Sequence, residues 1–186
     1  MLLPRERAVL LGSFSKIVSP GMGLGWLCAE KEIVDKAVTA KQASDLHSSI
    51  LSQRILFRYL QENDIDAHIS RITSAYASLC SLVLCLMNDL FPEEVHYTRP
   101  DGGMFIWLTL PPGCSATELW RRALAENVAI LPGTPFYTEG SGDSGVRLNF
   151  SNSDEEKTVE GMTRLARVIE RYLSECRDGR EQSSHT

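Results

Sequence analysis

The side chain best suited to covalent chemistry is a single lysine in a glycine- and serine-rich turn. An apolar run over residues 8–11 is followed by Ser13, Ser15 and Lys16, and then by a Pro-Gly pair at 20–21. The run is typical of a buried strand that delivers the lysine amine to the end of a sheet. Apolar neighbours would partly desolvate the amine and favour the neutral form, which attacks carbonyl carbons. The two hydroxyls and the N–H groups of the turn suit a phosphate. Composition alone favours a solvated surface lysine instead.

The order of residues in this turn resembles the Schiff-base segment of the fold-type I pyridoxal-phosphate aminotransferases. The shared pattern is Ser-x-Ser-Lys-x-x-x-Pro-Gly. The resemblance implies that Lys16 forms the Schiff base with pyridoxal 5'-phosphate and that Ser13 and Ser15 hold the cofactor phosphate. In that family an arginine seven positions after the lysine also clamps the phosphate, whereas this chain has Gly23 there. Because an arginine–phosphate pair is a strong charge-assisted contact, we expect weakened cofactor binding.

Arg147 is the second candidate, and it lies in an alternating segment over residues 146–150. By itself such an arginine faces solvent. The stretch Arg-Leu-Asn-Phe-Ser nevertheless resembles the family's substrate-carboxylate arginine, whose planar fork can bind a carboxylate bidentately. Residues 97–107 and 131–137 resemble the small-domain hairpin and the loop before that strand. Order and spacing agree along residues 8–173, and the resemblance is to the 2-aminoadipate, aromatic and branched-chain branch.

Apolar periodicity predicts the elements that position these groups. We expect strands at 8–12, 25–29, 95–98, 104–110, 128–131 and 146–150, and helices at 30–42, 48–63, 66–89, from Ser115 onward, and from 153 or 154 to 173. With the resemblance, the pattern predicts an α/β fold that forms the C-terminal part of a fold-type I transferase. The expected parts are the end of a large parallel-sheet domain (1–64), a long connecting helix (65–90), a small α+β domain (91–176) and a disordered tail (177–186).

Composition places the chain among ordinary globular proteins and disfavours several partners. It has 186 residues, 43% hydrophobic and 23% charged, with a formal net charge of -5. This acidic balance disfavours nucleic acid as a partner. The five cysteines are odd in number and lack metal-ligand spacing, so we expect reduced thiols and no metal site. Residues 1–7 show no signal-peptide pattern, and no window reaches the roughly 18 uninterrupted apolar residues of a membrane helix. We predict a soluble, cytoplasmic protein with no membrane partner.

Three functions are compatible with these features. The first is pyridoxal-phosphate-dependent transamination between an amino acid and a 2-oxo acid, in a homodimer as in full-length family members. Family members are much longer, and the resemblance implies that further cofactor-binding residues precede residue 1, so enzyme activity of this chain stays open. The second is an aminotransferase-like effector domain of a transcription regulator. The third is a non-catalytic remnant, in which the strands at 8–12 and 25–29 would be unpaired edges. The sequence does not indicate the amino donor or acceptor.

Overall fold

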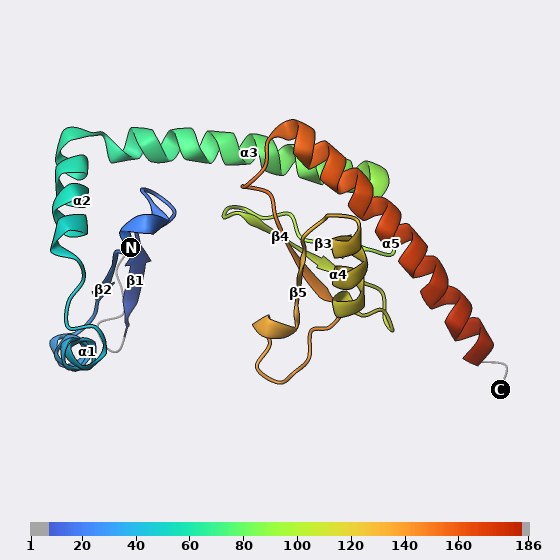
Figure 1. The fold of residues 1–186 in the computed structure, drawn as a ribbon, viewed down its shortest axis with the longest axis horizontal. Coiled ribbons are helices and arrows are strands. Elements are labelled where there is room, and N and C mark those ends of the chain that lie inside the picture. Colours follow the sequence, from blue (N-terminus) through green and yellow to red (C-terminus); the bar gives the residue numbers. More distant parts are fainter. Residues whose placement is uncertain (1–7, 184–186) are drawn as a thin grey trace. The chain divides into compact units, whose positions relative to one another are not determined.

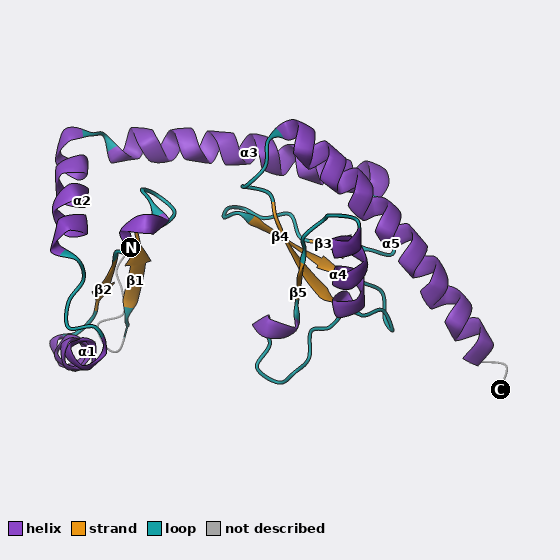
Figure 2. Cartoon of the chain, in the orientation of Figure 1, coloured by secondary structure: helices purple, strands orange, loops and turns teal. Residues whose placement is uncertain are grey.

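The computed structural model describes residues 8–183, and Figures 1 and 2 show their helices and strands. The chain divides into two compact units, residues 1–73 (unit 1) and 74–186 (unit 2), with the boundary inside one long helix. Each unit is described by itself below. The prediction that there is no signal peptide rests on residues 1–7, which lie outside the described residues.

Unit 1 is built from a two-stranded ribbon and two helices. Strand β1 (Leu10–Ser13) pairs antiparallel with β2 (Gly25–Cys28), with Gly12 opposite Trp26. The lysine turn and the short 3-10 helix η1 (Pro20–Met22) connect the strands, and helices α1 (Lys31–Ser44) and α2 (Ile50–Glu62) follow. The Ser49 hydroxyl accepts a hydrogen bond from the Ser52 N–H and caps α2, near the start of the helix expected over 48–63.

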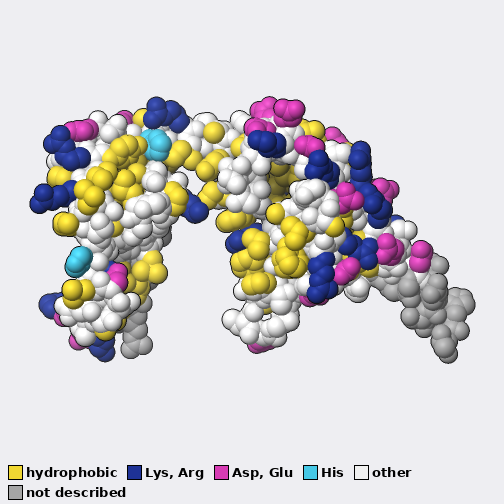
Figure 3. Space-filling model, viewed as in Figure 1, with side chains coloured by type: hydrophobic (Ala, Val, Ile, Leu, Met, Phe, Trp, Pro, Cys, Tyr) yellow, Lys and Arg dark blue, Asp and Glu magenta, His cyan; other side chains and the backbone are white. Residues whose placement is uncertain are grey.

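The ribbon of unit 1 is exposed, which contradicts the prediction of a buried strand at 8–11. Leu11 in β1 is 70% exposed, and Leu24 and Leu56 are the buried apolar side chains described in this unit. Figure 3 shows apolar side chains gathered at the surface of the unit's helices. The physical reason is that the ribbon has only two strands, so the faces of β1 and β2 lack a covering layer. The strands pair with each other, so each has one unpaired edge.

Helix α3 (Ile65–Leu90) begins in unit 1 and ends in unit 2. Its second half contributes Val83 and Met87 to the core of unit 2. By length and composition α3 is the one helix within the described residues that could cross a membrane, and a single such helix is weak evidence for a membrane span. The expectation of no membrane partner stays a prediction. Polar residues interrupt the apolar side chains of α3, so the helix contains no unbroken apolar run of the length that the sequence argument required. Core helices of soluble proteins can have the same length and composition.

Unit 2 is a four-stranded antiparallel sheet that packs one face against helices. The strand order is β3 (His96–Tyr97), β4 (Phe105–Thr109), β6 (Gly145–Asn149) and β5 (Leu131–Pro132). Side chains alternate along β4, so Ile106 and Leu108 are fully buried while their neighbours face outward. The buried residues join helices α3, α4 (Ala116–Ala125) and α5 (Glu155–Ser183) in one apolar core.

The C-terminal segment is helical farther than predicted. We expected a disordered tail from residue 177, but α5 continues to Ser183. Cys176 packs against the core, and the Arg177 guanidinium forms an ion pair with Glu94 at 2.8 Å. These contacts fix α5 at residues 176 and 177. Extending an existing helix costs much less free energy than starting a new one, so α5 can continue beyond them. Residues 184–186 lie outside the described part of the chain.

Candidate functional site

The lysine turn of unit 1 brings three predicted site residues together. The Ser15 N–H donates to Ser13 Oγ at 3.1 Å, and the Ser13 hydroxyl donates to Ser15 Oγ at 3.0 Å. The Val18 N–H donates to the Phe14 carbonyl at 2.8 Å and closes the turn that holds Lys16. Two converging hydroxyls, one and three residues before a lysine, are chemically suited to a ligand that carries both a phosphate and a carbonyl carbon.

Lys16 itself is exposed, which contradicts the prediction of a partly desolvated amine. A cavity of about 520 Å³ lies beside the turn, but its walls come from Phe14, Leu24 and side chains of α2, and Lys16 is not part of its lining. The apolar residues near Lys16 in the sequence are themselves only half-buried, so they do not shield the amine. Apolar neighbours in the sequence do not by themselves remove water from a side chain. Other elements must also pack over it.

Gly23 stands where the family pattern has its phosphate-binding arginine. It has φ 59° and ψ 33°, the left-handed region, and its N–H donates to the Pro20 carbonyl at 3.1 Å. A Cβ at this position would meet no atom within 4 Å. The glycine therefore suits the backbone of the turn without being required by crowding.

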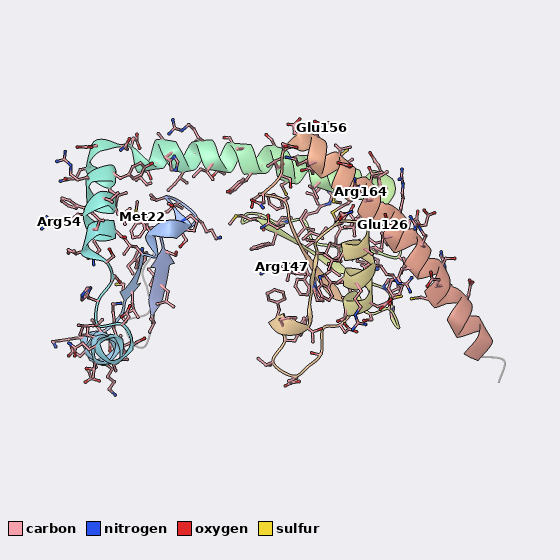
Figure 4. All side chains as sticks on the ribbon, viewed as in Figure 1. Met22, Arg54, Glu126, Arg147, Glu156 and Arg164 are labelled. Carbon is pink, nitrogen blue, oxygen red and sulfur yellow. The ribbon has the colours of Figure 1, made fainter. Side chains whose placement is uncertain are left out.

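Arg147 lies in unit 2, on the outward face of the sheet, and Figure 4 labels it there. Its guanidinium carbon lies over the Phe105 ring, 4.2 Å from the centroid, and over the Phe136 ring at 4.3 Å. Its Nε is buried without a hydrogen-bond partner among residues 8–183, and no carboxylate of the described residues forms an ion pair with Arg147. An arginine held by two rings and lacking a counter-ion is chemically suited to a carboxylate ligand.

The aromatic residues around Arg147 are functional candidates that the sequence reasoning missed. Trp107 lies opposite Arg147 in the β4–β6 register, and its ring meets the Phe136 ring edge-on with centroids 5.8 Å apart. Phe136 belongs to the 3-10 helix η2 (Thr134–Phe136) after β5. The two-residue alternation of β4 could have placed Phe105 and Trp107 on one face, but it gave no sign that Phe136 would fold onto that face.

Unit 1 thus carries Ser13, Ser15 and Lys16 in one turn, and unit 2 carries Arg147 by itself. Within residues 8–183, no group of three or more His, Cys, Asp or Glu side chains could hold a metal ion.

The chain is similar to known proteins along almost its whole length. The chain is 41% identical over 166 residues to a 2-aminoadipate transaminase of Thermus thermophilus, which covers 89% of this chain and 42% of that protein. It is 37% identical to aromatic-amino-acid aminotransferase 1 of Thermococcus litoralis, over 90% of this chain and 40% of the relative. The chain is homologous to the C-terminal part of fold-type I aminotransferases.

The solved structures agree with this relationship. LysN, the α-aminoadipate aminotransferase of Thermus thermophilus solved with N-(5'-phosphopyridoxyl)-L-leucine, matches with a TM-score of 0.86 over 89% of this chain and 42% of that one. The prediction of an α/β fold from the C-terminal part of this fold type is confirmed. The chain spans about two fifths of the length of these relatives. No family model matches the chain.

A second group of relatives consists of regulators. The chain is 26% identical over 166 residues to the HTH-type transcriptional regulator NorG of Staphylococcus aureus, which covers 89% of this chain and 37% of that protein. This identity is lower than that of the aminotransferases over the same stretch.

Proposed function

We propose that this chain supplies the Schiff-base lysine and the substrate-carboxylate arginine of a pyridoxal-phosphate-dependent aminotransferase. Its substrates are an amino acid and a 2-oxo acid, and its setting is soluble, cytoplasmic and homodimeric. The observation that carries the proposal is the match to proteins named as transaminases over about nine tenths of the chain. The Ser13–Ser15–Lys16 turn and the unpaired Arg147 support it independently of that match.

The proposal gives each residue a defined task. The Ser13 and Ser15 hydroxyls, 3.0 Å apart, hold the cofactor phosphate by donating hydrogen bonds to it. The Lys16 amine would hold the cofactor through its aldehyde carbon, with loss of water, and as a free amine would move a proton to or from the substrate α-carbon. Arg147 holds the substrate carboxylate through its fork of N–H donors. When bound, pyridoxal phosphate supplies the electron sink.

The test uses the full chain with pyridoxal phosphate, followed by borohydride reduction. We expect a reduced adduct on Lys16, located by peptide mass spectrometry, and loss of that adduct in Lys16→Ala. Exposed lysines also react with aldehydes, so Lys36→Ala, at another exposed lysine of unit 1, is the matched control and should leave the Lys16 adduct unchanged. An adduct spread evenly over exposed lysines would refute the role of Lys16.

A second candidate function is an aminotransferase-like effector domain of a transcription regulator, which the similarity to NorG favours. The two candidates differ in what the coding sequence upstream of residue 1 should specify. A basic helix-turn-helix segment supports the regulator, and further strands and helices of an aminotransferase large domain support the enzyme. Binding of pyridoxal phosphate by Lys16 alone is compatible with either candidate, so turnover of an amino acid decides between them.

A further inference from the structure

We propose that the rings of Phe105 and Phe136, called the aromatic clamp below, are positioning residues that hold the Arg147 guanidinium ready for a carboxylate. The inference rests on the proposed function, because it deepens the role given there to Arg147. It concerns two side chains in the segments 97–107 and 131–137, to which the sequence analysis gave no individual role.

The clamp follows from how the outward face of the sheet is assembled. Antiparallel pairing places Trp107 directly opposite Arg147 and Phe105 opposite Asn149. Odd-numbered residues of β4 and β6 therefore share this face, and the Phe105 ring lies diagonally next to Arg147. Phe136 reaches the same guanidinium from η2, with its centroid 4.3 Å from the guanidinium carbon.

The Phe136 ring is itself held in place. Trp107 meets it edge-on at an interplanar angle of 80°. The Trp107 ring in turn occupies the space over Gly145, where a Cβ would lie 2.4 Å from its Cζ2 atom. Close packing therefore runs from the strand backbone through Trp107 to Phe136 and limits how far the clamp can move.

Burial of one donor determines which part of the guanidinium a ligand can reach. Nε is buried and has no partner among the described residues, so a carboxylate cannot approach it from solvent. The two terminal nitrogens remain as the pair of donors for a bidentate carboxylate. An arginine side chain that rotates freely loses conformational entropy when it binds, and the clamp has already restricted that rotation.

The clamp also favours carboxylate ligands that carry an apolar chain. Phe105 is 37% exposed and Phe136 is 46% exposed, so both rings contact the guanidinium and still present apolar surface to a ligand. A 2-oxo acid with an aliphatic chain can pair its carboxylate with Arg147 and place that chain against a ring. A carboxylate without an apolar chain lacks the second contact.

The test measures carboxylate binding by the full chain without cofactor. The probe is 4-methyl-2-oxopentanoate, and its binding to every variant is followed by saturation transfer to the NMR signals of the probe itself. In the variants that keep Arg147, the Nε–H signal of Arg147, which Arg147→Lys assigns by removing it, gives a second readout. We expect Phe105→Leu and Phe136→Leu each to weaken binding about fivefold, the effect of one guanidinium–ring contact. Both variants should also speed hydrogen exchange at Nε–H. Phe105→Tyr and Phe136→Tyr keep a ring and should bind within about twofold of the parent.

Each result has a defined meaning. Phe57→Leu changes an exposed phenylalanine of unit 1 and is the matched control, expected to leave binding unchanged. Binding that is equal in the parent and in both leucine variants overturns the clamp and leaves the proposed function intact. Failure of the parent to bind, or equal binding by Arg147→Lys, overturns both the clamp and the role of Arg147. Loss of binding in the tyrosine variants also overturns it, since a retained ring would then not suffice.

Discussion

Replacing Gly23 with arginine should restore a phosphate contact at a small cost in stability. The cost is conformational, because Gly23 has φ 59° and a residue with a Cβ is disfavoured there by about 1 kcal/mol. Steric clashes do not increase this conformational cost, since a Cβ at position 23 meets nothing within 4 Å. The gain is a charge-assisted hydrogen bond to a phosphate, about 1.5 kcal/mol, which corresponds to roughly tenfold tighter binding.

Two measurements separate these opposing effects. Absorbance titration with pyridoxal phosphate should give a dissociation constant about tenfold lower for Gly23→Arg than for the parent chain. The urea midpoint without cofactor should fall for Gly23→Arg and Gly23→Ala alike, because both place a Cβ on the same backbone. Added salt should weaken the gain in binding.

The decisive control is Gly23→Gln, which has a long side chain and the same backbone strain but no charge. Cofactor binding that is equal in Gly23→Gln and Gly23→Arg would refute the reasoning. It would mean that residue 23 does not face the phosphate that we propose Ser13 and Ser15 to hold. A gain in Gly23→Lys that is smaller than in Gly23→Arg would favour a bidentate contact over a point charge.

Four further outcomes test the description of the units. Tyr172→Phe should lower the free energy of unfolding by about 1–2 kcal/mol, because the Ser115 N–H that donates to the phenol at 2.8 Å loses its acceptor. Burial raises the pKa of the Tyr172 phenol, so the unfolded chain ionises first; stability should fall as the pH rises above about 10, less so in Tyr172→Phe. Leu108→Ala should cost about 2–5 kcal/mol in a urea titration, since Leu108 is fully buried. Amides of β1 should exchange with deuterium faster than those of β4, because few apolar contacts cover β1; equal protection would contradict this.

Local sequence patterns predicted most of the elements because each rests on neighbours along the chain. The strand expected at 128–131 is an exception, since β5 covers only Leu131–Pro132. The Ser49 cap, the Ser115 cap and the spacing of apolar residues in α3 require only a few consecutive residues. The expected burial around Lys16 was wrong because burial depends on what packs over the turn. The aromatic surroundings of Arg147 were missed for a related reason, since Phe136 arrives from a loop whose path no periodicity determines.

The two groups of candidate residues therefore differ in how their reactivity is determined. Arg147 lies on a sheet whose opposite face is packed into a core, and its rings and its buried Nε belong to unit 2 alone. Its geometry is preorganised within that unit, so carboxylate binding should not depend on other parts of an enzyme. Lys16 lies in a ribbon with exposed faces, and its side chain is itself exposed. In the role that we propose for it, Lys16 therefore requires surfaces that cover the ribbon, and in the relative about three fifths of the chain lies outside the matched region. Carboxylate binding can thus persist under conditions in which Lys16 reacts slowly.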